Sequence, residues 1–349
     1  MTDLVNQIKE NVAKLQAPIR LMEVCGTHTA AIHRCGFPTL FRGEFEFLSG
    51  PGCPVCVTTS SYIDQLADLS NSIAVYTFGD MLRVPGNKTS LAESRAAGAK
   101  VNMMISPLEA VRRAAESYEP AIIAAVGFDT TAPAFALAVD YCVNNQVKNV
   151  YFLTELKTIE APLKYLLNSA PAIDALLLPG NVAAVIGEQG FKFIENYRLP
   201  AVITGFSGTD ILQALFILTA SLLKNDTAMH NQYRRIVRAE GNKKAQKLIN
   251  HYYEPCTAYF RGIGALGFSG LALRSEYAHL EYPSTYEFEQ TGQELESACQ
   301  CGNVLMGRIK PSECPLFASA CRPDHPQGAC MVSAEGSCAA YFRYGGGLP

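Results

Sequence analysis

The chain has 349 residues, of which 48% are hydrophobic and 17% are charged, so it carries enough apolar material for a sizeable buried core. Its formal net charge of -3 and the lack of a long Lys/Arg block exclude the basic surface by which proteins bind nucleic acids and anionic membranes. We therefore expect a globular protein of two or three domains, with neither nucleic acid nor membrane as a partner.

The N-terminal stretch predicts an amphipathic helix, because Leu4, Ile8, Val12 and Leu15 recur at helical spacing. It lacks the apolar core of a signal peptide, so no export is indicated. The most apolar later stretch, residues 211–223, is shorter than the roughly 18 residues that a membrane span needs, and we expect a buried helix there. These features predict a cytoplasmic protein.

Eight short apolar runs alternate with helical patterns along the first two thirds of the chain. We interpret them as the strands of two consecutive α/β units with mostly parallel sheets. Between the units, Ser106, Pro107 and Glu109 have the cap, first-turn proline and capping acid of a helix start. The predicted strands are residues 19–24, 45–50, 73–78, 101–106, 121–127, 150–154, 175–180 and 201–205.

These patterns divide the chain into three expected domains. The first α/β domain spans residues 1–119, and the second spans residues 120–224. Residues 225–349 begin with a charged helical stretch and continue as Gly-, Pro- and Cys-rich sequence with little periodicity. Since such a segment builds a poor core from side chains alone, we expect a bound metal centre to cross-link this smaller, irregular domain.

Four unusual motifs, CGTHT, PGCPVC, GFDTTAP and GFSGTD, each follow a predicted strand directly. Ligands of open parallel sheets bind at the carboxyl ends of the strands, where loops converge and helix N-termini point their N–H groups outward. We therefore expect Cys25, His28, Cys53, Cys56 and Asp129 to share one cleft. In that cleft Asp129 would orient a metal ligand or a partner residue.

Twelve cysteines in a reducing compartment favour metal ligation or redox chemistry over structural disulfides. Cys53 and Cys56 precede a predicted helix, where a thiol can have a lowered pKa and form a reversible disulfide. The alternative is half of a zinc site, which needs a second Cys or His pair, and none lies nearby in the sequence. Cys25 and His28 could bind the same metal ion, or the His28 imidazole could accept the proton of the Cys25 thiol. The alternative is that His28 is a hydrogen-bonded structural histidine.

Six further cysteines crowd the C-terminal region. Four thiolates suit zinc or an iron–sulfur cluster, and spacing alone leaves the metal undecided. The set that would tie the irregular segment to one point is Cys299, Cys314, Cys321 and Cys338. Cys301 and Cys330 remain alternative ligands.

The motifs MEVCGTHT, GPGCPVCV and GFDTTAPA, together with tail cysteines spaced C-x14-C-x6-C-x16-C, resemble the HypD family of [NiFe] hydrogenase maturation proteins. The resemblance covers essentially the whole chain. It implies two α/β domains with an iron–sulfur domain, and an assembly scaffold with redox activity rather than a conventional turnover enzyme. On this scaffold the Fe(CN)2(CO) fragment is assembled with a HypC-type chaperone and a HypE-type cyanide donor, and indirectly serves the hydrogenase large subunit.

The resemblance also implies roles for single residues. Cys25 is the iron ligand, His28 is its neighbour in the cleft, and Cys53 with Cys56 is the redox-active pair. The implied ligands of a 4Fe-4S cluster are Cys299, Cys314, Cys321 and Cys338. Two rival interpretations are an iron–sulfur-dependent thiol-disulfide reductase, which needs no iron at Cys25, and a zinc-stapled interaction protein.

Overall fold

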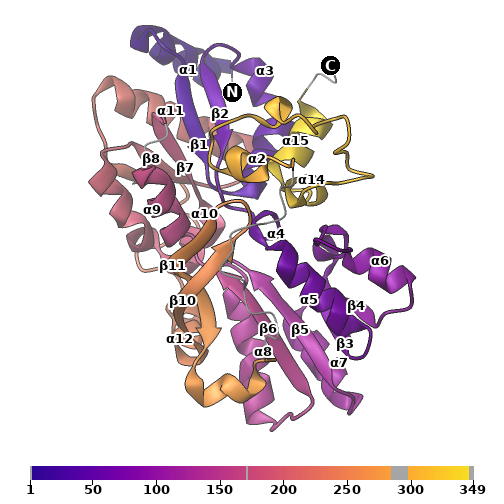
Figure 1. Ribbon diagram of the computed structural model, residues 1–349. Coiled ribbons are helices and arrows are strands. Elements are labelled where there is room, and N and C mark those ends of the chain that lie inside the picture. The colour runs from indigo at the N-terminus through magenta and orange to yellow at the C-terminus, as the bar shows by residue number, and fades with distance from the viewer. Residues whose placement is uncertain (1, 170–171, 284–297, 346–349) are drawn as a thin grey trace.

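A computed structural model describes residues 2–169, 172–283 and 298–345, and two sheets form its frame (Figure 1). Sheet A is all parallel and sheet B is mostly parallel. In sheet A the order is β2 (Phe45–Ser49), β1 (Ile19–Glu23), β7 (Ala175–Pro179), β8 (Ala201–Thr204) and β9 (Met229–Asn231). In sheet B the order is β10 (Tyr253–Phe260), β11 (Gly264–Leu273), β6 (Val150–Lys157), β5 (Ala121–Gly127), β3 (Ala74–Phe78) and β4 (Val101–Met104).

The predicted α/β architecture with mostly parallel sheets is confirmed, and each of the eight predicted runs coincides with one of β1 to β8. Among the described strands, the only antiparallel pairings are those of β11 with β10 and with β6. Strands buried on both faces explain the apolar runs, because successive side chains enter opposite cores. In β1, for example, Leu21 packs on one face of sheet A and Met22 on the other.

Helices cover both faces of each sheet. One face of sheet A packs against α1 (Thr2–Leu15), α2 (Gly26–Arg34), α3 (Phe37–Leu40) and α11 (Gly208–Leu223); the other packs against α9 (Glu160–Asn168), α10 (Gly180–Ile186) and the 3-10 helix η2 (Glu188–Tyr197). One face of sheet B packs against α4 (Pro54–Val57) and α5 (Ser60–Ser70). The other face packs against α7 (Pro107–Glu116), α8 (Ala132–Asn144) and α12 (Lys243–Tyr252).

Three predictions about helices are confirmed. The N-terminal amphipathic stretch is α1, the apolar stretch at 211–223 lies in the buried helix α11, and α7 begins after its predicted cap, Ser106. Within the described ranges, no helix has the length and apolar character needed to cross a membrane.

The two sheets do not follow the expected division into consecutive units. Strand β1, with β2 on its other side, pairs with β7, and Leu21 lies opposite Ala175. The expected boundary at residues 119–120 falls within sheet B, just before β5, and β9, β10 and β11 complete the two sheets although they follow residue 224. Apolar runs show where strands are but not which strands pair, because parallel pairing uses the same backbone groups in every strand.

The cysteine-rich C-terminal segment, residues 298–345, lies outside the sheets, as expected. It consists of turns and short helices and packs against α2 and α4 (yellow in Figure 1). Its helical elements are α13 (Cys301–Leu305), η4 (Pro311–Glu313), α14 (Ala329–Val332) and α15 (Ser337–Tyr344).

The tip of the β10–β11 hairpin joins this segment to α4. The backbone N–H of Arg261 donates to the carbonyl oxygen of Val57 at 2.9 Å. Gly262, with φ of +71°, lies directly against Gly302, and a Cβ on Gly302 would overlap the Gly262 carbonyl oxygen. The absence of both side chains therefore allows the two backbones to meet.

This contact predicts that Gly302→Ala destabilises the protein. The added methyl group must displace backbone, and we expect a loss of about 1–3 kcal/mol, seen as a lower melting temperature in thermal unfolding. Gly267→Ala is the matched control, because nothing lies within 4 Å of a Cβ at that position. Equal melting temperatures for the two variants would contradict the prediction.

Candidate functional site

The carboxyl edge of sheet A has a switch point between β1 and β7. From β1 the chain continues to β2 on one side, whereas β7, β8 and β9 follow one another on the other side. Loops diverge at such a point and leave room for a ligand. Cys25 follows β1 and Asn181 follows β7, and the Cys25 thiol lies 3.9 Å from the Asn181 Oδ1 atom. Asn181 was not predicted, although its position after an apolar run is the same signal that indicated Cys25.

The loop after β2 lies directly against the loop that holds Cys25. The Gly50 N–H donates to the carbonyl oxygen of Glu23 at 2.7 Å. A Cβ on Gly52 would overlap the backbone of Val24 and Cys25, so only glycine fits there. Cys25 and Cys53 thus begin neighbouring helices, α2 and α4, from loops in backbone contact.

Cys25 lies in a buried, acid-rich environment. Burial raises the pKa of its thiol to about 12, the charges of Glu23 and Glu335 act in the same direction, and contacts from Thr27 and the His28 backbone oppose them. The Glu23 carboxylate accepts the Cys25 N–H at 3.0 Å, and burial raises the pKa of Glu23 to about 8. The Cys25 thiol is therefore protonated near neutral pH, and a metal that binds it must displace the proton.

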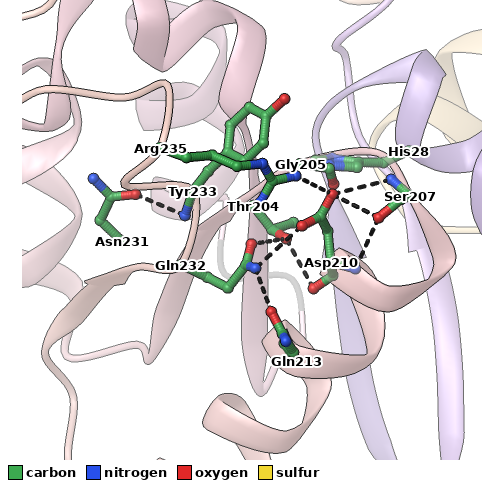
Figure 2. Close-up of polar contacts among 10 residues, drawn as sticks. All are labelled: His28, Thr204, Gly205, Ser207, Asp210, Gln213, Asn231, Gln232, Tyr233 and Arg235. Carbon is green, nitrogen blue, oxygen red and sulfur yellow. Dashed lines mark hydrogen bonds and ion pairs between the residues drawn. The ribbon is translucent and has the colours of Figure 1, made fainter. Parts of the chain in front are cut away.

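The His28 ring is held in one tautomer. Its Nε2 atom lies 3.0 Å from the carbonyl oxygen of Gly205, which can only accept, so Nε2 carries the proton (Figure 2). Burial lowers the His28 pKa to about 4, and the ring packs on Phe206. Nδ1 is buried without a hydrogen-bond partner among the described residues. It therefore offers a lone pair and no proton.

A polar network fixes the loop that supplies the Gly205 carbonyl (Figure 2). Asp210 accepts hydrogen bonds from Arg235 at 2.7 Å, from Ser207 and from Gln232. Burial raises the pKa of Asp210, but these hydrogen bonds outweigh it and hold the pKa below its usual range. Asp210 also closes a capping box with Ser207 at the start of α11. The GFSGTD motif thus serves to position the partner of His28.

Cys53 and Cys56 are buried, and no disulfide joins any of the cysteines that the structure describes. The Cys56 thiol lies close enough to Cys330 and Cys53, and the Cys330 thiol close enough to Cys301, for the neighbours to shift one another's pKa. Cys301 Sγ in turn lies 3.1 Å from Cys299 Sγ. Five thiols therefore form a continuous series from α4 to the C-terminal segment.

The lowered thiol pKa expected for the Cys-x-x-Cys pair is not found at Cys56. The hydrogen bond with Cys330 lowers its pKa, but the bond with Cys53 and burial act together to raise it well above its usual value. Cys56 lies within α4, which has only four residues and therefore a small dipole, and not at the start of α5 (Ser60–Ser70), the helix predicted after the pair.

The C-terminal cysteines surround one cavity, which we call the cysteine cavity. Its thiol lining contains the four cysteines of the family spacing and Cys301, whereas Cys330 lies between Cys56 and Cys301. The Gln327 N–H donates to Cys321 Sγ at 3.3 Å, a contact that favours the thiolate. The lining residues are Cys299, Gln300, Cys301, Val304, Cys314, Leu316, Phe317, Cys321, Met331 and Cys338.

The donor set of the cysteine cavity fits an iron–sulfur cluster. Its remaining walls are apolar or neutral, and soft thiolates in such surroundings suit iron–sulfur ligation. Within the described ranges, no three or more His, Cys, Asp or Glu side chains converge as ligands of one metal ion. Each iron of a cluster takes its own cysteine, so the ligands of a cluster are distributed around a cavity instead of converging on a point.

Asp129 follows β5, at the carboxyl edge of sheet B. Its carboxylate accepts the N–H of Ile159 at 2.9 Å, and burial raises its pKa to about 6. It therefore fixes the backbone after β6. Its membership of the cleft that contains Cys25 stays a prediction.

The fold and the site define an α/β protein that carries a thiol-lined candidate metal centre. The family described as "HypD: Hydrogenase formation hypA family" matches residues 1–345. The hydrogenase maturation factors HypD of Rhodobacter capsulatus and of Escherichia coli K12 are each 36% identical to the chain; they cover 96% and 98% of it, and the matches span 91% and 94% of their own lengths. HypD of Azotobacter vinelandii is 37% identical over 93% of the chain and 89% of its own length.

The chain therefore belongs to the HypD family of hydrogenase maturation factors, as the motifs indicated.

The lowered pKa of His28 predicts a pH-dependent stability. The unfolded chain takes up this proton near pH 6.5 and the folded protein near pH 4, so the unfolded state binds more protons between these values. The contribution of neutral His28 to the free energy of unfolding is therefore complete above pH 6.5. It is lost as the pH falls toward 4, by up to about 3 kcal/mol.

His28→Gln removes the titrating group but keeps a donor for Gly205, so its free energy of unfolding should fall less steeply between pH 6.5 and pH 4. Denaturant unfolding across this range measures the difference. His325→Gln, at an exposed position, is the control and should leave the slope unchanged. A His28 variant with the slope of the unsubstituted protein would contradict the assignment.

Proposed function

We propose that this protein is the scaffold on which the iron of a [NiFe] hydrogenase acquires its cyanide and carbon monoxide ligands. Its membership in a family of hydrogenase maturation factors supports the general role. The observation that carries the specific role is the position of Cys25: a buried thiol at the switch point of sheet A, next to Asn181 and against the Cys53 loop.

Cys25 would bind the incoming iron as a thiolate. A soft sulfur ligand suits iron that also carries cyanide and carbon monoxide. Because the unliganded thiol is protonated, a proton must leave as iron binds. Glu23 beside it has a pKa raised to about 8 and is itself largely protonated near neutral pH, so the thiol proton would have to leave the site. His28 presents a lone pair at Nδ1, so in this tautomer it would accept a hydrogen bond or a metal and would not donate to a cyanide nitrogen.

Cys53 and Cys56 would form the redox-active pair. Their conversion to a disulfide releases two electrons and two protons, and thiol–disulfide exchange along Cys330 and Cys301 would connect them with the cysteine cavity. A 4Fe-4S cluster held in that cavity would pass these two electrons one at a time, with an external redox partner as their final acceptor or source. Its proposed ligands are Cys299, Cys314, Cys321 and Cys338.

The proposed partners follow from this role. A small HypC-type chaperone would deliver or share the iron, a HypE-type protein would donate cyanide, and the hydrogenase large subunit would finally receive the fragment. The carboxyl edge of sheet A, where Cys25 lies, is the surface at which these partners would meet the iron.

Cys25→Ser tests the role of the iron ligand. The variant should fold and keep its cluster, because Cys25 forms no disulfide and a serine hydroxyl can replace the polar contacts of its sulfur with Asn181, Thr27 and the His28 backbone. It should lose the cyanide and carbon monoxide stretching bands that infrared spectroscopy records on anaerobically purified protein with its chaperone, and hydrogenase maturation should fall to background. Cys35→Ser, in the exposed end of the same helix, is the control and should keep both. Normal bands in Cys25→Ser would place the iron elsewhere.

A thiol-disulfide reductase is the second candidate, and the series of thiols from Cys53 to Cys299 favours it. In a reductase the cluster would pass electrons to Cys53 and Cys56, and protein disulfides would be the substrate. The same infrared experiment separates the two, because a reductase has no need of iron with diatomic ligands.

The cluster ligands can be assigned by single substitutions. Replacing Cys314, Cys321 or Cys338 by Ala should abolish the brown colour and the visible absorption, since each would remove one of four iron ligands. Cys299→Ala should do the same, whereas Cys301→Ala and the control Cys330→Ala should keep the absorption. Loss of absorption in Cys301→Ala but not in Cys299→Ala would contradict this assignment and show that Cys301, not Cys299, is the fourth ligand.

A further inference from the structure

Asn181 faces Cys25 across the switch point of sheet A. It lies in the first turn of α10, directly after β7, whereas Cys25 follows β1. The Asn181 Oδ1 atom is 3.9 Å from the Cys25 Sγ atom, although the two residues are 156 positions apart in the sequence. The pairing of β1 with β7 brings them together. A metal bound to the Cys25 sulfur would therefore have the Asn181 side chain as a neighbour.

Two contacts fix the orientation of the Asn181 amide. The backbone N–H of Val182 donates to the amide oxygen, Oδ1, at 2.9 Å, and because an N–H can only donate, the amide nitrogen must point the other way. The preceding residue, Gly180, has no room for a side chain, since a Cβ there would overlap the Thr204 carbonyl oxygen and the Tyr233 ring. Neighbouring loops therefore hold the backbone that carries Asn181 in place.

The Asn181 amide nitrogen, Nδ2, has unused donor capacity. Its side chain is half-buried, and Nδ2 makes no hydrogen bond with any residue that the structure describes. An amide nitrogen carries two N–H groups, so both remain available to a ligand at the site.

Three other donors near Cys25 are already engaged. The Thr27 hydroxyl donates to Glu335 at 2.7 Å, and the backbone N–H of Cys25 donates to Glu23 at 3.0 Å. The proton of the His28 ring is on Nε2, which donates to a backbone carbonyl oxygen and is turned away from the thiol by that bond. Asn181 differs from these residues because its N–H groups have no partner among the described residues.

We propose that the Asn181 amide donates a hydrogen bond to a cyanide ligand of the iron on Cys25, and so determines which coordination position cyanide occupies. The inference rests on the proposed function, because it requires iron with cyanide at Cys25. The nitrogen of metal-bound cyanide carries negative charge and is a good acceptor, whereas the oxygen of metal-bound carbon monoxide is a weak one. A neutral amide suits this acid-rich site, since it does not form an ion pair with Glu23 or Glu335 as a lysine or arginine would.

Asn181 also contacts the thiol of the unliganded site, so the test must separate its donor from its shape. Asn181→Leu keeps a side chain of similar size and removes the donor, whereas Asn181→Gln keeps an amide. Asn181→Ala is a second variant without a donor. Asn144→Leu is the matched control, because it makes the same chemical change at an exposed position of α8, on sheet B.

The experiment is infrared spectroscopy of anaerobically purified protein with its chaperone, in H2O and in D2O. A hydrogen bond to cyanide draws electron density from the iron, so its loss leaves more density to weaken the bonds of both diatomic ligands. The cyanide and carbon monoxide bands of Asn181→Leu should therefore shift to lower wavenumber. The shift should be smaller in Asn181→Gln and absent in Asn144→Leu. Transfer to D2O should displace a cyanide band of the unsubstituted protein more than it displaces that of Asn181→Leu.

Two results would overturn the inference while leaving the proposed function intact. One is unchanged bands at normal intensity in Asn181→Leu. The other is an equal shift, or an equal loss of the bands, in the Leu, Ala and Gln variants, which would indicate a role of shape alone. Loss of the bands in the Leu and Ala variants but not in the Gln variant would support the donor. If the unsubstituted protein shows no such bands, or Cys25→Ser keeps them, the proposed function itself fails at this site.

Discussion

The contact of Gly52 with the backbone of Val24 and Cys25 is the constraint on which the site depends. It exists because β1 and β2 are adjacent and parallel, so both chains leave the sheet at the same edge and their loops must share the same space. A side chain at Gly52 would push the loops apart. With glycine there, Cys25 and Cys53 begin two helices from one point, and the second helix leads away from sheet A toward sheet B and the C-terminal segment.

The thiols of α4 and of the C-terminal segment lie in a single apolar core. Cys53 and Cys56 belong to the same buried cluster of side chains as Cys301, Cys321 and Cys330. In a low-dielectric interior, a charge formed on one of these sulfurs acts strongly on the others. In the proposed function, thiol chemistry at α4 and metal chemistry at the cysteine cavity would therefore be coupled electrostatically, whether or not sulfur atoms exchange between them.

The sequence allowed a good prediction of the elements and of the thiols, and a poor one of their partners. Apolar runs identified β1 to β8, and the rule for carboxyl ends of strands identified Cys25 and Cys53. The pairing of β1 with β7 joins segments far apart in the chain, and nothing in an apolar run specifies its neighbour. Glu335 and Arg261 were missed for the same reason: each acts on a thiol from a segment that only the tertiary structure brings near.

The burial of Cys25 has a consequence for the order of events at the site. A thiol with a pKa of about 12 is a poor ligand until its proton leaves, and negative charges from Glu23 and Glu335 make that loss harder. A cation that arrives reverses both effects, since it attracts the same carboxylates and stabilises the thiolate. In the proposed function, the protonated Cys25 thiol would resist stray oxidants, which attack thiolates, and would become reactive only as the metal enters. In the proposed function, deprotonation of Cys25 and arrival of the iron would be one step. Glu335, which lies on the C-terminal segment against Gly26 and accepts a hydrogen bond from Thr27, would link that step to the packing of the segment on α2.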